Sequence, residues 1–315
     1  MRILLITPAP PRSRAGNRAT AARWAHILRT LGHTVEISVS YTNQTADMML
    51  ALHAWRSADS IQLFAERFPH RPLIVAITGT DAYRFIHSHP QPTLQSIRLA
   101  HQLVGLHDLI NNTLPADQRH KMHVIHQSAE PVAKRNPYKR YFHVSVMGHL
   151  REEKDPMRPA MAVRNLPASS RIQVHHFGKA HSAEWAQQAT AEMRINSRYH
   201  WHGEIAHHKI RQVYQRTHVL LLPSRMEGGA NVISEAIVAG IPVIASNIEG
   251  SIGLLGEDYA GYYPVEDEQA LSELLLKAES DHKFYNQLEK ACIARQPLFT
   301  TDNELNGWRQ LLNKL

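Results

Sequence analysis

Short apolar runs alternate with longer segments of helical period along the chain. Residues Arg2–Thr7 (RILLIT) form an apolar run that prolines close, which is typical of a buried parallel strand. The next segment, RATAARWAHILRTLGH, places apolar side chains at helical spacing and predicts a helix that ends at Gly32. Thr34–Val39 then has the pattern of a second strand. Together these residues predict a β-α-β unit.

The same alternation continues through the sequence with one interruption. Further strands are expected at 47–52, 72–77, 122–126, 142–147, 172–177, 199–202, 219–222 and 242–245. Further helices are expected at 58–68, 184–194, 205–216, 232–239, 269–278 and within 299–315. Residues 94–106 are expected to form a helix that leads into a strand. Residues 130–141 break the pattern with two prolines and four basic residues, as an interdomain linker does. The sequence therefore predicts an α/β fold of two Rossmann-like parallel-sheet domains, with ligands at the carboxyl ends of the strands.

Three segments follow from this division. Residues 1–135 are expected to form an N-terminal Rossmann-like domain and residues 136–295 a C-terminal one. The last segment, 296–315, is expected to be a helix that packs back toward the N-terminal domain. A length of 315 residues agrees with about two domains.

Composition places the chain among globular proteins of a reducing compartment. Hydrophobic residues make up 43% of the sequence and charged residues 20%. The single cysteine, Cys292, allows no intrachain disulfide, and we expect a buried helix residue there and a cytoplasmic protein. The opening MRILLITPAPP has too short an apolar stretch for a signal peptide, and no run of about 18 apolar residues suggests a membrane span. No stable membrane association is therefore expected, and the oligomeric state is left open.

The charge balance favours an anionic ligand without naming it. The chain has 35 Lys and Arg against 28 Asp and Glu, a formal net charge of +7. It lacks a basic run and any zinc-finger or RNA-binding signature, so nucleic acid is not expected as a partner. The 22 histidines include the pairs 175–176 and 207–208 but no spacing typical of metal ligands, so no metal site is expected.

The stretch EGGANVISEAIVAG, residues 227–240, carries the clearest chemical signal. It follows the predicted strand at 219–222, so Glu227 and two glycines form a turn and Asn231 is expected to cap the next helix. Unpaired backbone N–H groups at a helix N-terminus suit a phosphate. Glu235, about one turn inside the helix, can accept two hydroxyl hydrogen bonds from a ribose, and Glu227 can hold another sugar hydroxyl. This spacing favours a sugar nucleotide with its diphosphate between the two carboxylates.

This stretch resembles the Glu-x7-Glu motif of retaining GT-B glycosyltransferases of family four. The segments VSVMGHLREEKDP, TLGHTVEISV and PRSRAGNRAT resemble other parts of the same family, so the resemblance covers most of the chain. It implies a GT-B fold, with two Rossmann-like domains facing a central cleft, nucleotide-sugar donors, no bound metal or cofactor, and retention of anomeric configuration. The N-terminal domain would hold the acceptor and the C-terminal domain the nucleotide sugar.

Residue by residue, the resemblance assigns a donor site. Lys154 matches the diphosphate lysine, Glu227 the carboxylate near the donor sugar, and Glu235 the ribose carboxylate. His149 stands where the family has an arginine, and Arg151 is the nearby side chain that can supply that charge. The catalytic residues implied are Glu227, Lys154 and Arg151. The donor-binding set is His149, Arg151, Lys154, Glu227, Gly228, Gly229, Ala230, Asn231, Val232 and Glu235, with Gly229 in place of the family's usual aromatic residue.

The acceptor region differs from the family at one position. Family members often carry His-Gly-x-Asp at the end of a strand, where this chain has Thr78-Gly79-Thr80-Asp81. The nearby loop offers Arg12, Arg14 and Arg18 around Gly16 and Asn17, which is either a pocket for a small, highly charged anion or a solvated basic loop. The expected acceptor-binding set is Arg12, Arg14, Gly16, Asn17, Arg18, Thr78, Gly79, Thr80 and Asp81.

A narrower resemblance links these features. The segments TPAPPRSRAGNRATAARWA, ALHAWRSADSI, ITGTDAY and GHLREEKDP resemble the selenosugar synthases, a glycosyltransferase family of selenoneine biosynthesis. The resemblance implies a carbon–selenium bond between a UDP-sugar such as UDP-N-acetylglucosamine and selenophosphate, with release of UDP and phosphate. Selenophosphate is already an anion at neutral pH, so this attack needs no general base.

Two other functions remain open from the sequence. One is a GT-B glycosyltransferase acting on a hydroxyl acceptor such as a lipid, because the helix at 18–31 carries Arg18, Arg23, Arg29 and Trp24, which suit contact with anionic lipid. Leu28, Leu31 and Trp24 of this helix equally suit a protein core. The other is a non-catalytic protein that binds a nucleotide sugar.

Overall fold

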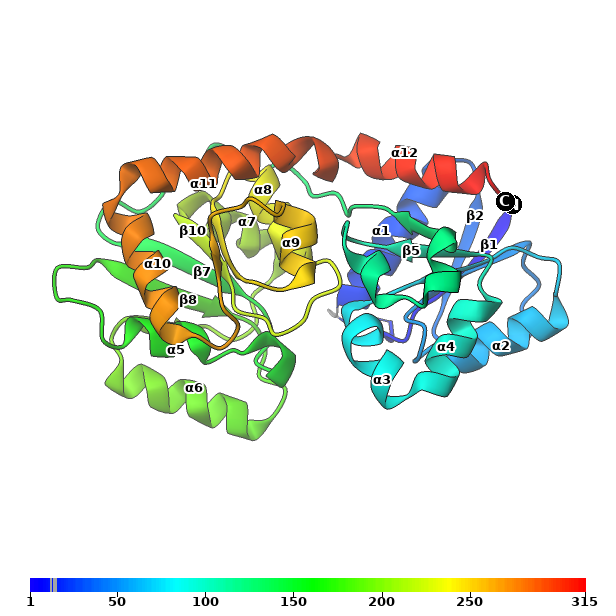
Figure 1. The fold of residues 1–315 in the computed structure, drawn as a ribbon, viewed down its shortest axis with the longest axis horizontal. Coiled ribbons are helices and arrows are strands. Elements are labelled where there is room, and N and C mark those ends of the chain that lie inside the picture. Colours follow the sequence, from blue (N-terminus) through cyan, green and yellow to red (C-terminus); the bar gives the residue numbers. More distant parts are fainter. Residues whose placement is uncertain (12, 14–15) are drawn as a thin grey trace. The chain divides into compact units, whose positions relative to one another are not determined.

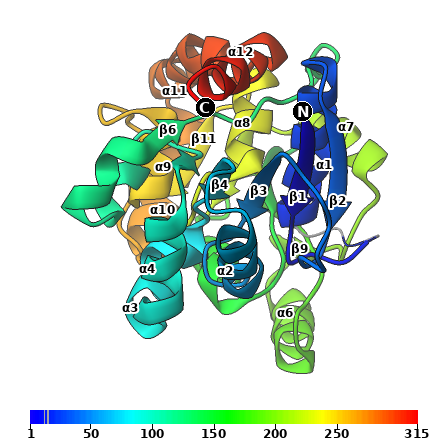
Figure 2. The same cartoon turned by 90° about the vertical axis from the view of Figure 1, so that its right-hand side faces the viewer.

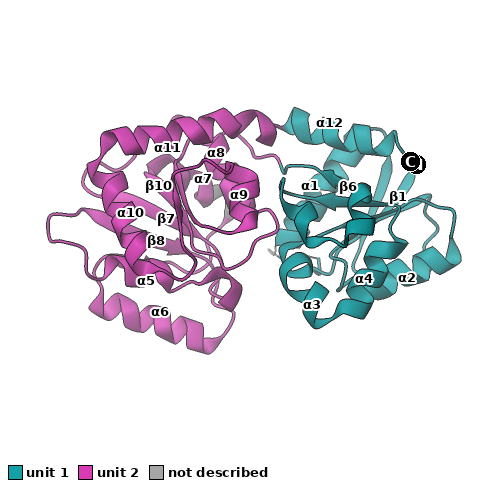
Figure 3. Cartoon of the chain, viewed as in Figure 1, with its two compact units in different colours: residues 1–127, 301–315 teal, residues 128–300 magenta. Residues whose placement is uncertain are grey.

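The computed structural model describes residues 1–11, 13 and 16–315, with the backbone alone at 207 and 208. The chain divides into two compact units (Figure 3): unit 1 comprises Met1–Gln127 and Thr301–Leu315, and unit 2 comprises Ser128–Thr300. Unit 2 therefore begins before residue 136, and unit 1 takes in the final helix.

Unit 1 is built on a parallel sheet of six strands in the order β2-β1-β3-β4-β5-β6. Figure 1 labels β1, β2 and β5 of this sheet. The strands are β1 (Arg2–Ile6), β2 (Thr34–Ser38), β3 (Met48–Leu52), β4 (Leu73–Ala76), β5 (Gln102–Gly105) and β6 (Met122–Val124). The longer helices are α1 (Gly16–Thr30), α2 (Ala58–Arg67), α4 (Pro90–Leu99) and α12 (Thr301–Leu312). Shorter helical segments are η1 (Asp81–Phe85), α3 (Ile86–Ser88), η2 (Ile110–Thr113) and η3 (Ala116–Lys121).

Alternating side chains of the central strands pack against helices on both faces of this sheet. One buried cluster joins Leu4 and Met49 to α2 and α4, and the other joins Ile3 and Met48 to α1 and α12. Figure 2 shows the ribbons of these helices and of β1 to β4. Strands buried on both faces read as continuous apolar runs rather than as alternating ones, which explains sequences such as MMLAL in β3.

The final helix is held to α1 by a pair of tryptophans. Trp24 and Trp308 are fully buried, with ring centroids 4.8 Å apart in an edge-on arrangement. The indole N–H of Trp24 also donates to Glu304 Oε1 at 2.8 Å. A buried indole needs such a partner, so the carboxylate at 304 is part of the core of unit 1.

Unit 2 repeats the architecture with a parallel sheet in the order β12-β11-β10-β7-β8-β9. Its strands are β7 (Phe142–Met147), β8 (Ile172–Phe177), β9 (Tyr199–Trp201), β10 (Val219–Leu222), β11 (Val243–Ser246) and β12 (Tyr262–Tyr263). Its helices are η4 (Glu152–Lys154), α5 (Arg158–Val163), α6 (Ala183–Ile195), α7 (His207–Arg216), α8 (Asn231–Val238), α9 (Glu249–Leu255), α10 (Glu268–Ser280), α11 (His282–Arg295) and η5 (Gln296–Phe299).

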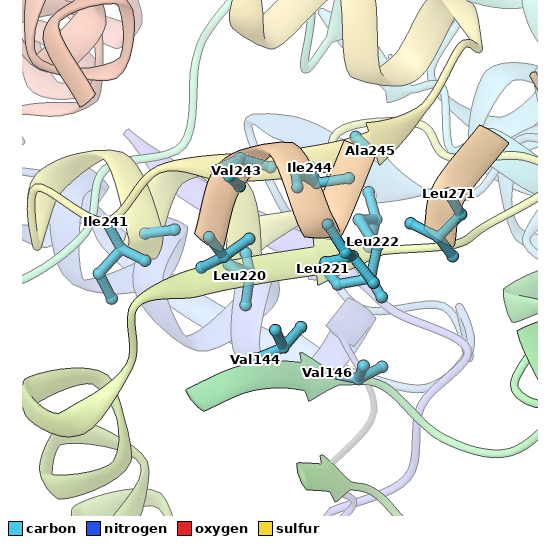
Figure 4. Packing of buried hydrophobic residues seen from close by; sticks show 14 of the residues in the cluster. Val144, Val146, Leu220, Leu221, Leu222, Ile241, Val243, Ile244, Ala245 and Leu271 are labelled. Carbon is cyan, nitrogen blue, oxygen red and sulfur yellow. The ribbon is translucent and has the colours of Figure 1, made fainter. Parts of the chain in front are cut away.

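The core of unit 2 is formed by the apolar runs of β7, β10 and β11 with the helices around them. Figure 4 shows part of it, with labelled side chains Val144, Val146, Leu220, Leu221, Leu222, Ile241, Val243, Ile244, Ala245 and Leu271. Cys292 lies in α11 and is fully buried, as the sequence predicts. The expected fold of two parallel-sheet, Rossmann-like domains is confirmed.

One local prediction is wrong. Asn231 is the first residue of α8, and Ala230 occupies the cap position with φ −73° and ψ 110°. Gly229, at φ 116°, makes the turn that delivers the chain to Ala230, and only glycine adopts this conformation without strain. The helix consequently begins without a side-chain cap from its own cap residue.

Candidate functional site

Strand pairing in unit 2 brings two predicted loops to the same edge of the sheet. β7 and β10 are parallel neighbours, with Val144 opposite Val219 and Ser145 opposite Leu220. The loop after β7 contains His149, Arg151 and Lys154, and the loop after β10 leads to Glu227 and α8. Both loops leave the carboxyl ends of their strands, where ligands of open α/β sheets bind.

Lys154 and Glu227 form the centre of this edge. The Lys154 Nζ atom contacts Glu227 Oε1 directly, and the two side chains are only 19% and 10% exposed. Ser224 Oγ donates to the same carboxylate oxygen at 2.6 Å. The lysine charge is thus fixed beside the start of α8, and an incoming anion would compete with Glu227 for it.

The turn that carries Lys154 is itself clamped. Asp155 adopts a left-handed conformation, φ 41°, directly after Lys154, and its Oδ2 accepts from Arg158 Nε at 2.9 Å. The backbone N–H of Arg225 donates to the Glu153 carbonyl at 2.9 Å, which ties this turn to the loop of Glu227. Arg225 is a site residue that the sequence reasoning missed, although an arginine two positions before Glu227 is a signal that could have identified it.

The N-terminus of α8 is the second anion-attracting feature. Ala230 has no side-chain acceptor for the first N–H groups of the helix, and the first turn contains no acidic residue. These N–H groups and the helix dipole therefore favour an anion at this end. Gly228, Gly229 and Val232 lie in the same loop and first turn, so the structure brings the predicted backbone donors together with Lys154 and Glu227.

Gly250, which the sequence did not indicate, packs against the backbone of Glu227. A Cβ atom at Gly250 would lie 2.2 Å from the carbonyl oxygen of Glu227, so only glycine lets α9 approach this closely. The helix α9 was not predicted, because the stretch EGSIGLL contains two glycines and is short.

Glu235 is held one helical turn further on. The hydroxyl of Tyr214 donates to Glu235 Oε2 at 2.6 Å, and Tyr214 is 2% exposed. Burial, reinforced by the charge of Glu235, raises the pKa of Tyr214 well above its usual range, so the phenol stays a hydrogen-bond donor. Tyr214 orients the carboxylate that the sequence assigns to a ribose, and only the tertiary contact between α7 and α8 reveals it.

His149 is a neutral donor rather than a replacement cation. Its Nδ1 accepts from the backbone N–H of Lys179 at 3.1 Å, which leaves the proton on Nε2. Burial, with the neighbouring His181, lowers the pKa of His149, so the ring is uncharged at neutral pH. Arg151 is a cation of this turn besides Lys154: its side chain is 38% exposed, and its Nε lies 3.9 Å from Glu153 Oε2.

In unit 1, the predicted acceptor residues that the structure describes follow β1 and β4. Gly16, Asn17 and Arg18 form the first turn of α1. Arg12 and Arg14 lie outside the described residues. The structure brings Thr78, Thr80 and Asp81 together, since Asp81 Oδ2 accepts from both the backbone N–H (3.0 Å) and the hydroxyl (2.8 Å) of Thr78. Gly79 lies between them in the same loop.

His53 joins this group and was missed by the sequence reasoning. It directly follows β3, is 1% exposed, and places its Nδ1 2.6 Å from Asp81 Oδ1. Asp81 Oδ2 and Oδ1 also accept the backbone N–H groups of Ala54 and Trp55, each at 3.0 Å. His53 has φ 76°, a left-handed conformation that costs a non-glycine residue about 1–2 kcal/mol. A histidine at the end of an apolar run was the available signal.

The hydrogen bonds of His53 define its tautomer. The Arg56 backbone N–H points at His53 Nδ1 from 3.2 Å, but Asp81 Oδ1 is much closer, at 2.6 Å, and already accepts the Trp55 backbone N–H. Nδ1 therefore holds the ring proton and donates it to Asp81. His53 Nε2 then accepts from the Thr80 hydroxyl, 3.1 Å away. The arrangement provides a base whose orientation is fixed and whose lone pair faces a hydroxyl.

The described residues contain neither a metal-ligand cluster nor a membrane-spanning helix. Within them, no three His, Cys, Asp or Glu side chains are arranged to hold a metal ion. Among the helices in this same part of the chain, none combines the length and the apolarity needed to cross a membrane.

Comparisons with known proteins agree with this geometry. Residues 128–295 match the family model described as glycosyl transferases group 1. No curated protein sequence matches the chain.

Solved structures share the fold over the whole chain at low identity. Anabaena Alr3699/HepE in complex with UDP and glucose has a TM-score of 0.80 at 15% identity, with 100% of both chains covered. Sucrose-phosphate synthase from Thermosynechococcus elongatus has a TM-score of 0.78 at 16% identity, covering 100% of this chain and 98% of that one. The lipopolysaccharide outer core galactosyltransferase WaaB has a TM-score of 0.73 at 13% identity, with 100% of both chains covered.

Proposed function

The chain belongs to the glycosyl transferases of group 1, and from that premise we propose that it joins the sugar of a UDP-sugar to selenophosphate. The reaction forms a carbon–selenium bond at the anomeric carbon and releases UDP and phosphate. UDP-N-acetylglucosamine is the proposed donor, and selenoneine biosynthesis is the proposed context. We place the protein in the cytoplasm and expect only small-molecule substrates, with no cofactor.

The observation that carries the donor half of this proposal is the Lys154–Glu227 contact in the loop that leads to α8, whose cap residue Ala230 supplies no side-chain acceptor. The lysine and the helix N-terminus would stabilise the negative charge that develops on the leaving diphosphate. Glu235, oriented by Tyr214, would accept the ribose hydroxyls. Displaced from Lys154 by the diphosphate, Glu227 would bind the transferred sugar. UDP is bound in the structure of HepE, whose fold this chain shares, and that supports the choice of donor.

Support for selenophosphate comes from the residues of unit 1. Thr78 stands where related enzymes often have a histidine, which fits an acceptor that needs no deprotonation to attack carbon. The three arginines around Gly16 and Asn17 would pair with a small anion of high charge. Three of the four sequence segments that resemble selenosugar synthases also lie in unit 1, and the fourth, GHLREEKDP, lies in unit 2.

A hydroxyl acceptor is the second candidate, and the His53–Asp81 pair is the observation that favours it. A sugar or lipid hydroxyl must lose a proton as it attacks, and His53 could accept that proton. A protein that only binds nucleotide sugars would release no UDP at all.

A mass-spectrometric screen separates these functions. The protein is incubated with each of several UDP-sugars and with selenophosphate, thiophosphate or phosphate, and the products are identified by mass. We expect UDP and a selenium-containing sugar only when a UDP-sugar and selenophosphate are both present. UDP release that does not depend on selenophosphate contradicts the proposal.

Two variants connect that activity to the site. Glu235→Gln should weaken UDP binding by about tenfold or more, because the amide accepts ribose hydroxyls less strongly than the carboxylate does. Glu273→Gln, the same change at an exposed position of α10, is the matched control and should bind UDP as the unchanged protein does.

A further inference from the structure

Thr80, His53 and Asp81 form a connected set of side chains that the attack on carbon does not use. Asp81 and His53 are almost fully buried, with side-chain exposures of 1% and 2%, whereas Thr80 is partly exposed. The hydrogen bonds run from Thr80 Oγ1 to His53 Nε2 (3.1 Å) and from His53 Nδ1 to Asp81 Oδ1 (2.6 Å). A hydroxyl on a base that a carboxylate orients is the arrangement of an activated nucleophile.

The surroundings hold this set rigidly. Besides His53, Asp81 accepts four hydrogen bonds, three from backbone N–H groups of the loops after β3 and β4 and one from the Thr78 hydroxyl. The His53 ring lies beside Phe85, 5.6 Å between centroids, and Trp55 stacks on Phe85 at 4.0 Å. The base therefore cannot turn away from Thr80 without breaking several contacts.

The proposed reaction has a second half that needs such a group. Selenium in selenophosphate attacks carbon as an anion, so no base is required in that step. The product of that step still carries its phosphoryl group on selenium, and removing it requires an oxygen nucleophile, which at neutral pH must lose a proton.

We infer that Thr80 is the nucleophile that removes the phosphoryl group from selenium, with His53 as its base and Asp81 as the positioning residue. Thr80 Oγ1 forms a bond to phosphorus, the phosphorus–selenium bond breaks, and selenium leaves with the bonding pair. His53 Nε2 takes the threonine proton and passes it to the departing selenolate. Asp81 stabilises the imidazolium that exists in between.

Water completes the cycle. A water molecule attacks the phosphothreonine while His53 Nε2 accepts its proton, the phosphorus–oxygen bond to Thr80 breaks, and His53 returns the proton to the threonine oxygen. The sum is the selenium phosphoester plus water giving the selenol and hydrogen phosphate, with no oxidant, reductant or other reactant.

The test measures phosphate and UDP in the same reaction, because this inference rests on the proposed function. The ratio of phosphate to UDP is independent of how fast the sugar is transferred. The unchanged protein should release the two in equal amounts. Thr80→Val should lower the ratio by about a hundredfold or more and accumulate the sugar–selenium–phosphate ester, whereas Thr80→Ser, which keeps the hydroxyl, should keep the ratio near that of the unchanged protein.

His53→Gln gives an independent readout. It should lower the ratio about a hundredfold, because Thr80 then has no base to take its proton. Thr30→Val, the same chemical change at the last residue of α1, is the matched control and should leave the ratio unchanged. Acid quenching during turnover should trap one phosphoryl group on the peptide that contains Thr80.

The outcomes separate the two proposals. If no UDP is released with selenophosphate, the proposed function is wrong. A synthetic sugar–selenium–phosphate ester, added without any UDP-sugar, then still tests the inference directly, since the unchanged protein should hydrolyse it and Thr80→Val should not. Equal release of phosphate and UDP by Thr80→Val, or hydrolysis of the ester by that variant at the original rate, overturns the inference.

Discussion

The contact between Tyr214 and Glu235 gives the sharpest test of the donor site, through the change Tyr214→Phe. The substitution removes one buried hydroxyl, which donates to Glu235 Oε2 at 2.6 Å, and keeps the ring that packs in the core of unit 2. A hydrogen bond to a charged acceptor contributes about 1.5–3 kcal/mol, so this range bounds the loss when the carboxylate is no longer oriented. If all of this free energy is lost from the binding of the ribose, the Kd for UDP rises by about 10-fold to 150-fold.

The assay is isothermal titration of UDP into the purified protein, accompanied by thermal unfolding. Tyr259→Phe is the matched control, because Tyr259 is 5% exposed, also lies in unit 2, and hydrogen-bonds the backbone of Val243 instead of a site residue. The control should lower Tm without changing the Kd for UDP. A Tyr214→Phe protein that binds UDP as tightly as the unchanged protein would show that Glu235 does not hold the ribose, or that it needs no orientation to do so.

Three further predictions concern other parts of unit 2. Lys154→Met should lower kcat by about a hundredfold, because it removes a cation that stabilises the leaving diphosphate, and a UDP-release assay checks this. Gly250→Ala should lower the free energy of unfolding by about 1–3 kcal/mol and weaken UDP binding, because its Cβ would lie 2.2 Å from the Glu227 carbonyl oxygen; urea unfolding and titration measure both effects. Burial lowers the pKa of His143 to about 2 and that of His176 to about 4. Below pH about 6.5 these two histidines are protonated in the unfolded chain but not in the folded one. Lowering the pH from 7.5 to 5.5 should therefore reduce the free energy of unfolding of unit 2 by about 1.4 kcal/mol for each histidine. Equal urea midpoints at the two pH values would contradict this prediction.

The sequence predicts those parts of the fold whose cause is local. Apolar runs as continuous as those of β1, β3 and β10 occur only in strands buried on both faces, and helical periods between them leave few alternatives to a parallel sheet. The loop at 227–229 is also predictable from local sequence, because two glycines between a strand and a helix indicate a tight turn. The helix cap was predicted one residue too late because Asn is a good cap by propensity, while the actual start depends on the turn at Gly229.

Other parts of the site depend on contacts between distant residues. Tyr214 lies 21 positions before the carboxylate that it orients, and Arg225 donates to a carbonyl 72 positions earlier, at Glu153. His53 and Asp81 are 28 positions apart, with a helix and a strand between them, and they meet only because β3 and β4 are neighbours in the sheet. No periodicity or propensity in one sequence encodes such pairings.

The most direct measurement is a crystal structure of the protein with UDP bound. We predict that the diphosphate lies against Lys154 Nζ and the first N–H groups of α8, with the ribose hydroxyls on the carboxylate of Glu235. UDP bound elsewhere in the protein, or bound with Lys154 still paired to Glu227, would contradict the donor site on which the proposed function depends.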